Sequence, residues 1–131
     1  MRDHDSADGY ILVVDDSDGA RDVIADILRG HGLKVRTTGT ASAAMRIMRA
    51  SPPKLVTIDL FMPGESGFAL RSAMLRDPEL ANVPVIVVSG YWGKPPDALE
   101  VAAVIRKPID IDRLLALVDD ALSPTAEALE A

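Results

Sequence analysis

The sequence predicts a doubly wound α/β domain, in which a single five-stranded parallel sheet carries helices on both faces. Short apolar segments rich in β-branched residues alternate along the chain with segments whose apolar residues recur at helical spacing. The apolar segments are nearly continuous, which is typical of parallel strands covered on both sides. Several polar residues follow directly after these segments, and open α/β sheets gather their ligands at the carboxyl ends of their strands.

The first half of the chain predicts two strands, each followed by a helix. Tyr10–Val14 is an apolar segment that stops at two aspartates, and Lys34–Thr37 is a short alternating segment. Helical spacing after the first segment is carried by Ala20, Val23, Ile24, Ile27 and Leu28. That helix is expected to end at Gly30 and Gly32. A second helix, ended by Pro52–Pro53, is predicted from Ala41, Ala44, Met45 and Met48.

The second half predicts three more strands, at Leu55–Asp59, Pro84–Ser89 and Ala103–Arg106. A turn at Pro63–Gly64 precedes Ser66, which is a suitable N-cap for the helix after the third strand. The helix after the fourth strand is expected to be short, because glycines and prolines suppress its start and only Asp97–Ala102 can form it. Ile111–Leu122 gives the clearest amphipathic helix of the chain.

Length and composition predict one soluble domain. The chain has 131 residues, of which 48% are hydrophobic and 26% charged, and its apolar runs are too short to span a bilayer. The domain is placed at residues 10–122, between a flexible N-terminal segment (1–9) and a C-terminal tail or linker stub (123–131). Residues 1–9 lack the apolar stretch of a secretory signal, so the expected location is the cytoplasm.

Charge and cysteine content exclude several classes of function. The net charge is −6 and the basic residues are scattered, which argues against direct binding of nucleic acid. The absence of cysteine excludes disulfides, thiolate metal sites and cysteine nucleophiles.

Three carboxylates are predicted to converge at the strand ends. Asp15 and Asp16 follow the first strand, and Asp59 ends the third. Such groups repel one another unless a cation relieves the charge, and Mg²⁺ prefers oxygen ligands of this kind. Lys107 and Ser89, at the ends of the last two strands, would add an ammonium group and a hydroxyl to a site suited to a phosphoryl group.

Four segments in this order resemble the signature segments of the receiver domains of two-component response regulators: Val13–Ser17, Ile58–Gly64, Ser89–Gly90 and Lys107–Pro108. The likeness extends from Tyr10 to Leu122 and implies the flavodoxin-like receiver fold of the chemotaxis-regulator superfamily. It also implies the partner, which is a sensor histidine kinase or a histidine phosphotransfer protein.

The resemblance implies a role for each site residue. Asp59 is the phosphoacceptor, in a Mg²⁺-dependent reaction that makes the chain a signalling module and not a turnover enzyme. The implied Mg²⁺ ligands are Asp59 itself, Asp16 as a direct ligand, Asp15 as a ligand mostly through water, and Phe61 through its backbone carbonyl. The Lys107–Pro108 peptide bond is expected to be cis.

The sequence departs from the family at the residues that transmit the signal. Receivers commonly carry Tyr or Phe three positions before the lysine, where this chain has Val104. With that ring missing, Ser89 together with Tyr91 and Trp92, which follow it closely, are candidates for a substitute switch. Alternatively, the two aromatic residues only contribute packing area to a loop.

Four of the site residues also have a structural alternative. Asp15 and Asp16 could cap the first helix, Ser89 could end its strand, and Lys107 could be a solvated surface charge.

Three functional contexts remain open. The chain could be a stand-alone receiver, or a receiver module excised from a hybrid histidine kinase or a larger multidomain regulator. A third possibility is a phosphatase or phosphotransferase of similar fold, but such enzymes generally need an acid two positions after the nucleophile, where this chain has Phe61.

Overall fold

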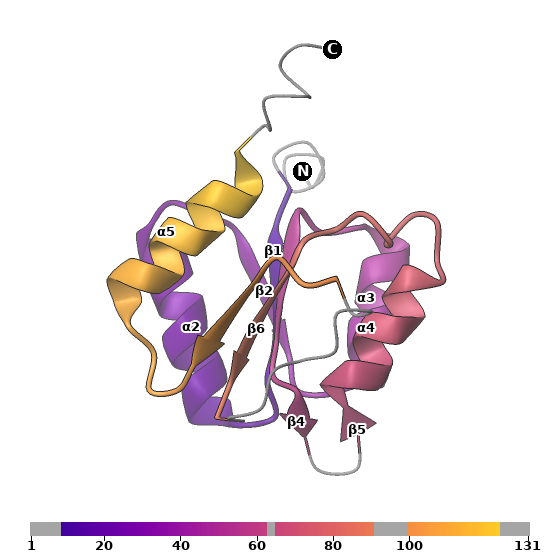
Figure 1. Cartoon of the computed structure of the whole chain (residues 1–131), viewed down its shortest axis with the longest axis horizontal. Coiled ribbons are helices and arrows are strands. Elements are labelled where there is room, and N and C mark those ends of the chain that lie inside the picture. Colours follow the sequence, from indigo (N-terminus) through magenta and orange to yellow (C-terminus); the bar gives the residue numbers. More distant parts are fainter. Residues whose placement is uncertain (1–8, 63–64, 91–99, 124–131) are drawn as a thin grey trace.

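The computed structural model describes residues 9–62, 65–90 and 100–123. Its centre is a parallel sheet of five strands in the order β2-β1-β3-β6-β7 (Figure 1). These strands are β1 (Ile11–Val14), β2 (Val35–Thr38), β3 (Leu55–Ile58), β6 (Val85–Ser89) and β7 (Ala103–Arg106). The helices within the described residues are α2 (Asp18–Gly30), α3 (Ala41–Ala50), α4 (Gly67–Leu75) and α5 (Ile111–Leu122).

The predicted fold class is confirmed. The central strand β1 pairs with β2 on one side and β3 on the other, so that Leu12 aligns with Arg36 and with Val56. The chain therefore first builds outward to β2 and then reverses direction across β1 to reach β3. Ligands of doubly wound sheets bind beyond the carboxyl ends of the strands at such a reversal.

Two hydrophobic clusters fill the space between the sheet and its helices. In Figure 1, α2 and α5 cover one face of the sheet and α3 and α4 cover the other. Alternate residues of β1 serve the two faces, because successive side chains of a strand point in opposite directions. Leu12 and Val14 pack on the side of α3 and α4, whereas Ile11 and Val13 pack on the side of α2 and α5.

Side-chain caps fix where three of the helices begin. The N-cap residues Ser17, Thr40 and Asp110 precede α2, α3 and α5, and each accepts a hydrogen bond from a backbone N–H of the first turn. Such a cap contributes about 1 kcal/mol and satisfies a donor that the helix itself leaves unpaired.

Several bounds differ from the sequence-based expectations. The second strand begins at Val35 instead of Lys34, and Asp59 lies just beyond β3. A short hairpin, β4 (Phe61–Met62) paired with β5 (Glu65–Ser66), was not predicted, because two-residue strands show no periodicity. It precedes α4, which begins directly after Ser66, the expected N-cap position.

The expected helix at Asp97–Ala102 is wrong at its C-terminal end. Residues 100–102 are not helical, and residues 97–99 lie outside the described residues. Glu100 has a φ of 50°, in the left-handed region, which does not continue a right-handed helix. Pro63–Gly64, the N-terminal segment up to residue 8 and the tail from residue 124 also lie outside the described residues.

Among the residues that the structure describes, no helix is long and apolar enough to cross a membrane.

Candidate functional site

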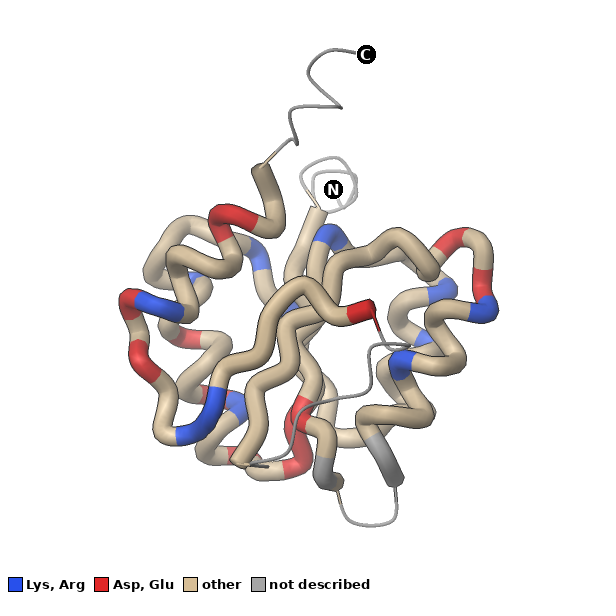
Figure 2. The backbone as a smooth tube through the Cα atoms, viewed as in Figure 1, with Lys and Arg blue, Asp and Glu red and all other residues tan. Residues whose placement is uncertain are grey.

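The three predicted carboxylates meet at the carboxyl edge of the sheet. Asp15 follows β1 and Asp59 follows the adjacent strand β3, with Asp16 beside them. One carboxylate oxygen from each of the three lies within 4.8 Å of the others. Asp15 and Asp59 are buried, at 1% and 7% exposure, whereas Asp16 is exposed. A group of acidic segments is visible at this lower edge of the molecule in Figure 2.

Backbone hydrogen bonds continue the sheet into the site. The Asp15 N–H donates to the Thr38 carbonyl over 3.2 Å, and the Asp59 N–H donates to the Val14 carbonyl over 3.0 Å. The carboxylate Oδ1 of Asp15 accepts from the Ser17 N–H at 2.9 Å. These bonds fix the positions of both buried aspartates relative to the strands that carry them.

The alternative that Asp15 or Asp16 caps the first helix is wrong. Ser17 is the N-cap of α2, and its side chain accepts from the Ala20 N–H. The Oδ1 atom of Asp15 instead accepts a hydrogen bond from the N–H of Ser17, the N-cap residue itself. Its Oδ2 atom faces the site, where it accepts from Lys107. The two aspartates are therefore available for the site at the sheet edge.

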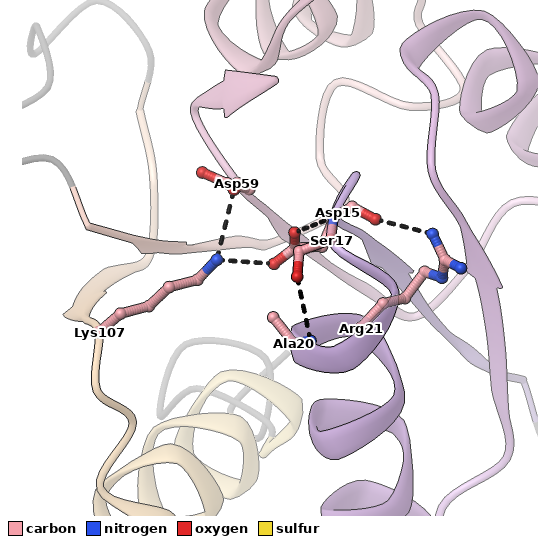
Figure 3. Close-up of polar contacts among 6 residues, drawn as sticks. All are labelled: Asp15, Ser17, Ala20, Arg21, Asp59 and Lys107. Carbon is pink, nitrogen blue, oxygen red and sulfur yellow. Dashed lines mark hydrogen bonds and ion pairs between the residues drawn. The ribbon is translucent and has the colours of Figure 1, made fainter. Parts of the chain in front are cut away.

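Lys107 joins the two buried carboxylates. Its Nζ lies 2.9 Å from Oδ2 of Asp15 and 3.4 Å from Oδ2 of Asp59 (Figure 3). The Lys107–Pro108 bond is cis, as predicted. Lys107 is therefore not a solvated surface charge, which was its structural alternative.

The charge of Lys107 is maintained by its partners. Burial tends to lower the pKa of its ammonium group, but hydrogen bonding and charge interactions with Asp15 and Asp59 outweigh burial and raise the pKa above its usual value. The ammonium group therefore stays protonated at neutral pH. The site therefore combines one positive charge, on Lys107, with three neighbouring carboxylates.

Ser89 is the last residue of β6 and is buried at the same edge. It pairs with Arg106 of β7, and its carbonyl accepts a hydrogen bond from the Lys107 N–H at 3.0 Å. Ser89 thus ends its strand, as its structural alternative holds, and also lies on the strand next to Asp59. The structure brings both predicted phosphate-binding residues to the end of neighbouring strands.

The expected switch residues are only partly within the described region. Val104 lies in β7 opposite Val87, and it packs against the hydrophobic cluster on the side of α3 and α4. Tyr91 and Trp92 lie outside the described residues. Phe61, whose backbone carbonyl the resemblance implies as a ligand, begins β4 two residues after Asp59.

Gly67 is a site residue that the sequence did not single out. A Cβ atom at this position would lie 2.4 Å from the Asp59 carbonyl oxygen and 2.8 Å from the Leu60 Cα. The Gly67 N–H donates to the Leu60 carbonyl at 3.1 Å. Helix α4 therefore begins in direct contact with the backbone of Asp59, and only glycine allows this approach. The only sequence signal is a glycine at the predicted start of a helix.

The donor set fits a hard divalent cation. Carboxylate oxygens are the ligands that Mg²⁺ prefers, and three of them lie together here. Three carboxylates and one ammonium group leave two negative charges, the charge that one Mg²⁺ ion would balance. Asp16 is the exposed member of the group, so a hydrated ion can reach it from solvent.

Comparison with known proteins agrees with this geometry. The profile of the response regulator receiver domain matches residues 11–119. Protein PilH of Pseudomonas aeruginosa is 29% identical over 120 residues, which cover 86% of this chain and 97% of PilH. The DNA-binding transcriptional regulator NtrC of a Bradyrhizobium species is 33% identical over 125 residues, which cover 91% of this chain but 25% of NtrC.

A solved structure shows the same architecture. The signal receiver domain of a signal transduction histidine kinase from Syntrophus aciditrophicus superposes with a TM-score of 0.80 at 27% identity, covering 90% of this chain and 92% of that one. Receiver domains are signalling modules that interact with histidine kinases, and they generally bind Mg²⁺. Since the family profile matches residues 11–119, nearly the whole sheet and its helices, the chain belongs to the response regulator receiver domain family.

Proposed function

We propose that Asp59 accepts a phosphoryl group from a phosphohistidine of a sensor histidine kinase or histidine phosphotransfer protein. The observation that carries this proposal is the position of the Asp59 carboxylate, which lies 3.4 Å from the Lys107 ammonium group and has an oxygen within 4.8 Å of carboxylate oxygens of Asp15 and Asp16. An anion that attacks a phosphoryl group needs cations and alignment more than it needs a base. Both are available around Asp59.

In the proposed reaction an oxygen of Asp59 forms a bond to phosphorus as the phosphorus–nitrogen bond of the phosphohistidine breaks. The bonding electrons leave with the imidazole. Lys107, already 3.4 Å from Asp59, binds one phosphoryl oxygen, and the Ser89 hydroxyl donates to another. Hydrolysis reverses the modification, because water attacks phosphorus and releases inorganic phosphate from Asp59.

Mg²⁺, when bound, would supply positive charge to the phosphoryl oxygens. Asp16 is proposed as its direct ligand, Asp15 as a ligand mostly through water, and Phe61 as a ligand through its backbone carbonyl. Asp59 is proposed as a further carboxylate ligand. The exposure of Asp16 and the existing bonds of Asp15 to Ser17 and Lys107 support this division. Asp15 has less freedom to reach a metal ion directly.

The phosphoryl group is proposed to change which protein the domain binds. We place the functional unit at residues 10–122 and in the cytoplasm. Relatives of the chain occur in three contexts. The chain matches PilH over nearly the full length of PilH, it matches the receiver domain of a histidine kinase, and it matches about a quarter of the DNA-binding regulator NtrC. The acidic net charge of −6 favours proteins over nucleic acid as direct partners of this chain.

The alternative of a small-molecule phosphatase is disfavoured. Its acid would be expected two positions after the nucleophile, where this chain has Phe61. Catalytic turnover of small phosphoesters by the unsubstituted chain would support this alternative.

The test is incubation with a small phosphodonor and Mg²⁺, followed by intact-mass measurement. The unsubstituted chain should gain one phosphoryl group, and Asp59→Asn should gain none, because the change is nearly isosteric and removes the nucleophile. Asp26→Asn, which alters an exposed aspartate of α2, is the matched control and should react at the original rate. A phosphorylated Asp59→Asn variant would contradict the proposal.

A further inference from the structure

Arg71 is a buried charge that the proposed chemistry does not use. It lies on α4 with 4% of its surface exposed. Its Nη1 donates to the Val83 carbonyl at 3.3 Å and its Nη2 donates to the Glu100 carbonyl at 3.0 Å. A buried guanidinium group is costly unless it is hydrogen-bonded, and here it binds two backbone carbonyls that precede two different strands.

Arg71 and Gly67 lie on the same side of α4, because residues four apart in a helix share a face. Gly67 contacts the Asp59 backbone, and Arg71, one turn later, holds the segment that enters β7. In Figure 1 the orange segment that leads into β7 begins close to α4. One helix thus contacts both the phosphoacceptor and the start of the last strand.

The other end of β7 returns to the site. β7 spans Ala103–Arg106 and is followed at once by Lys107, whose Nζ lies 3.4 Å from Asp59. Asp59, α4, Arg71, Glu100 and β7 with Lys107 therefore form a closed series of contacts. Contacts therefore connect Asp59 to both ends of β7.

The entry to β7 is held in an unfavourable backbone conformation. Glu100 has a φ of 50°, which is rare for a residue other than glycine, and its carbonyl is the acceptor for Arg71. Two residues later, the Ala102 N–H donates to the Val85 carbonyl at 2.8 Å. A segment that its contacts hold against its own preference can change conformation when those contacts change.

We propose that Arg71 is a positioning residue that couples the state of Asp59 to the segment Glu100–Arg106. Phosphorylation shifts the start of α4 through Gly67, and Arg71 carries this shift to the Glu100 carbonyl. The coupling supplies a path to β7 in a chain that has Val104 at the usual aromatic position. This inference rests on the proposed role of Asp59.

The test is amide hydrogen exchange of the full chain with and without beryllofluoride, a phosphoryl mimic, in Mg²⁺. In the unsubstituted chain the mimic should change exchange at Glu100–Arg106. In Arg71→Met the mimic should still bind. The change in exchange at Glu100–Arg106 should fall to less than about one fifth of its size in the unsubstituted chain, because linked sites are typically coupled by a factor of about five or more. Arg76→Met, which alters an exposed arginine just after α4, should keep the full response.

Two further variants separate coupling from structural support. Glu100→Gln removes a side-chain charge that acts on the Arg71 guanidinium group but keeps the carbonyl acceptor, so most of the response should remain. Arg71→Lys keeps the charge but lacks the planar fork that reaches two carbonyls, so its response should be intermediate. If Arg71→Met does not fold, the comparison of Arg71→Lys with the unsubstituted chain decides, and a full response in Arg71→Lys then overturns the inference.

The outcomes distinguish this inference from the proposed function. Absence of mimic binding at Asp59 in the unsubstituted chain would overturn both. Binding without a response at Glu100–Arg106 would overturn the coupling alone. A lower unfolding midpoint in Arg71→Met with the response preserved would assign Arg71 a structural role only and contradict the proposal.

Discussion

Replacement of Gly67 by alanine should destabilise the domain and disturb the site together. The added Cβ would lie 2.4 Å from the Asp59 carbonyl oxygen, 2.8 Å from Cγ2 of Ile58 and 2.8 Å from the Leu60 Cα. Two of these neighbours are backbone atoms, which cannot rotate away as a flexible side chain would. Helix α4 must therefore move away from Asp59, or the strand end must shift.

The magnitude follows from two opposing effects. Overpacking costs about 1–3 kcal/mol, and a clash with backbone belongs at the upper end of that range. Alanine in place of glycine in a helix returns up to about 1 kcal/mol. The net loss for Gly67→Ala should be about 2 kcal/mol in the free energy of unfolding.

Urea unfolding provides the assay, with Gly30→Ala as the matched control. Gly30 is the last residue of α2, and a Cβ there would meet nothing within 4 Å. Gly30→Ala should leave stability unchanged or raise it by up to about 1 kcal/mol. If Gly67→Ala were as stable as the unsubstituted chain and accepted phosphate at the same rate, the contact between α4 and Asp59 would have no energetic weight, and this reasoning would be refuted.

Three further changes test other parts of the structure. Asp16→Asn should weaken Mg²⁺ binding in a calorimetric titration more than Asp15→Asn does. Asp15→Asn should lower the Mg²⁺ affinity by about 10- to 100-fold, as expected for a ligand that acts through water. Equal losses of affinity would count against the division of roles. Lys107→Met should bind Mg²⁺ roughly tenfold more tightly, because an ammonium group near two ligand carboxylates repels a second cation; weaker binding would contradict this. Thr40→Ala should lower the free energy of unfolding by about 1 kcal/mol in urea, since its side chain caps α3; an unchanged value would show that solvent replaces the cap.

The sequence predicted those parts of the fold in which local pattern and tertiary structure agree. The apolar runs of the central strands are buried on both sides, so their composition reports their position directly. Two of the site residues were predictable for the same reason, because Asp15 and Asp59 each follow such a strand, whereas Lys107 follows the edge strand β7. The order β2-β1-β3-β6-β7 then brings the first two side by side.

The contacts of α4 could not be predicted in this way. Arg71 follows Leu70 in a helix and, by residue type, is expected at the surface. Its burial depends on carbonyl acceptors at Val83 and Glu100, which lie 12 and 29 residues away in sequence. Gly67 likewise gives no local sign that a neighbouring backbone lies against it.

The prediction that the short helix includes residues 100–102 was wrong for a related reason. Helical propensity over this stretch does not include the bond from Arg71 to the Glu100 carbonyl or the bond from Ala102 to Val85. These tertiary bonds hold the segment in a non-helical path into β7, and such contacts override local propensity.

The most direct test of the central claim locates the phosphoryl group itself. The chain is phosphorylated with a small phosphodonor in Mg²⁺, reduced with borohydride to convert the acyl phosphate to homoserine, and digested for peptide mass spectrometry. Homoserine should appear at position 59 and not at Asp15 or Asp16, although all three carboxylates lie within 4.8 Å of one another. Homoserine at Asp15 or Asp16, or at an aspartate away from this edge of the sheet, would contradict the assignment of Asp59 as the phosphoacceptor.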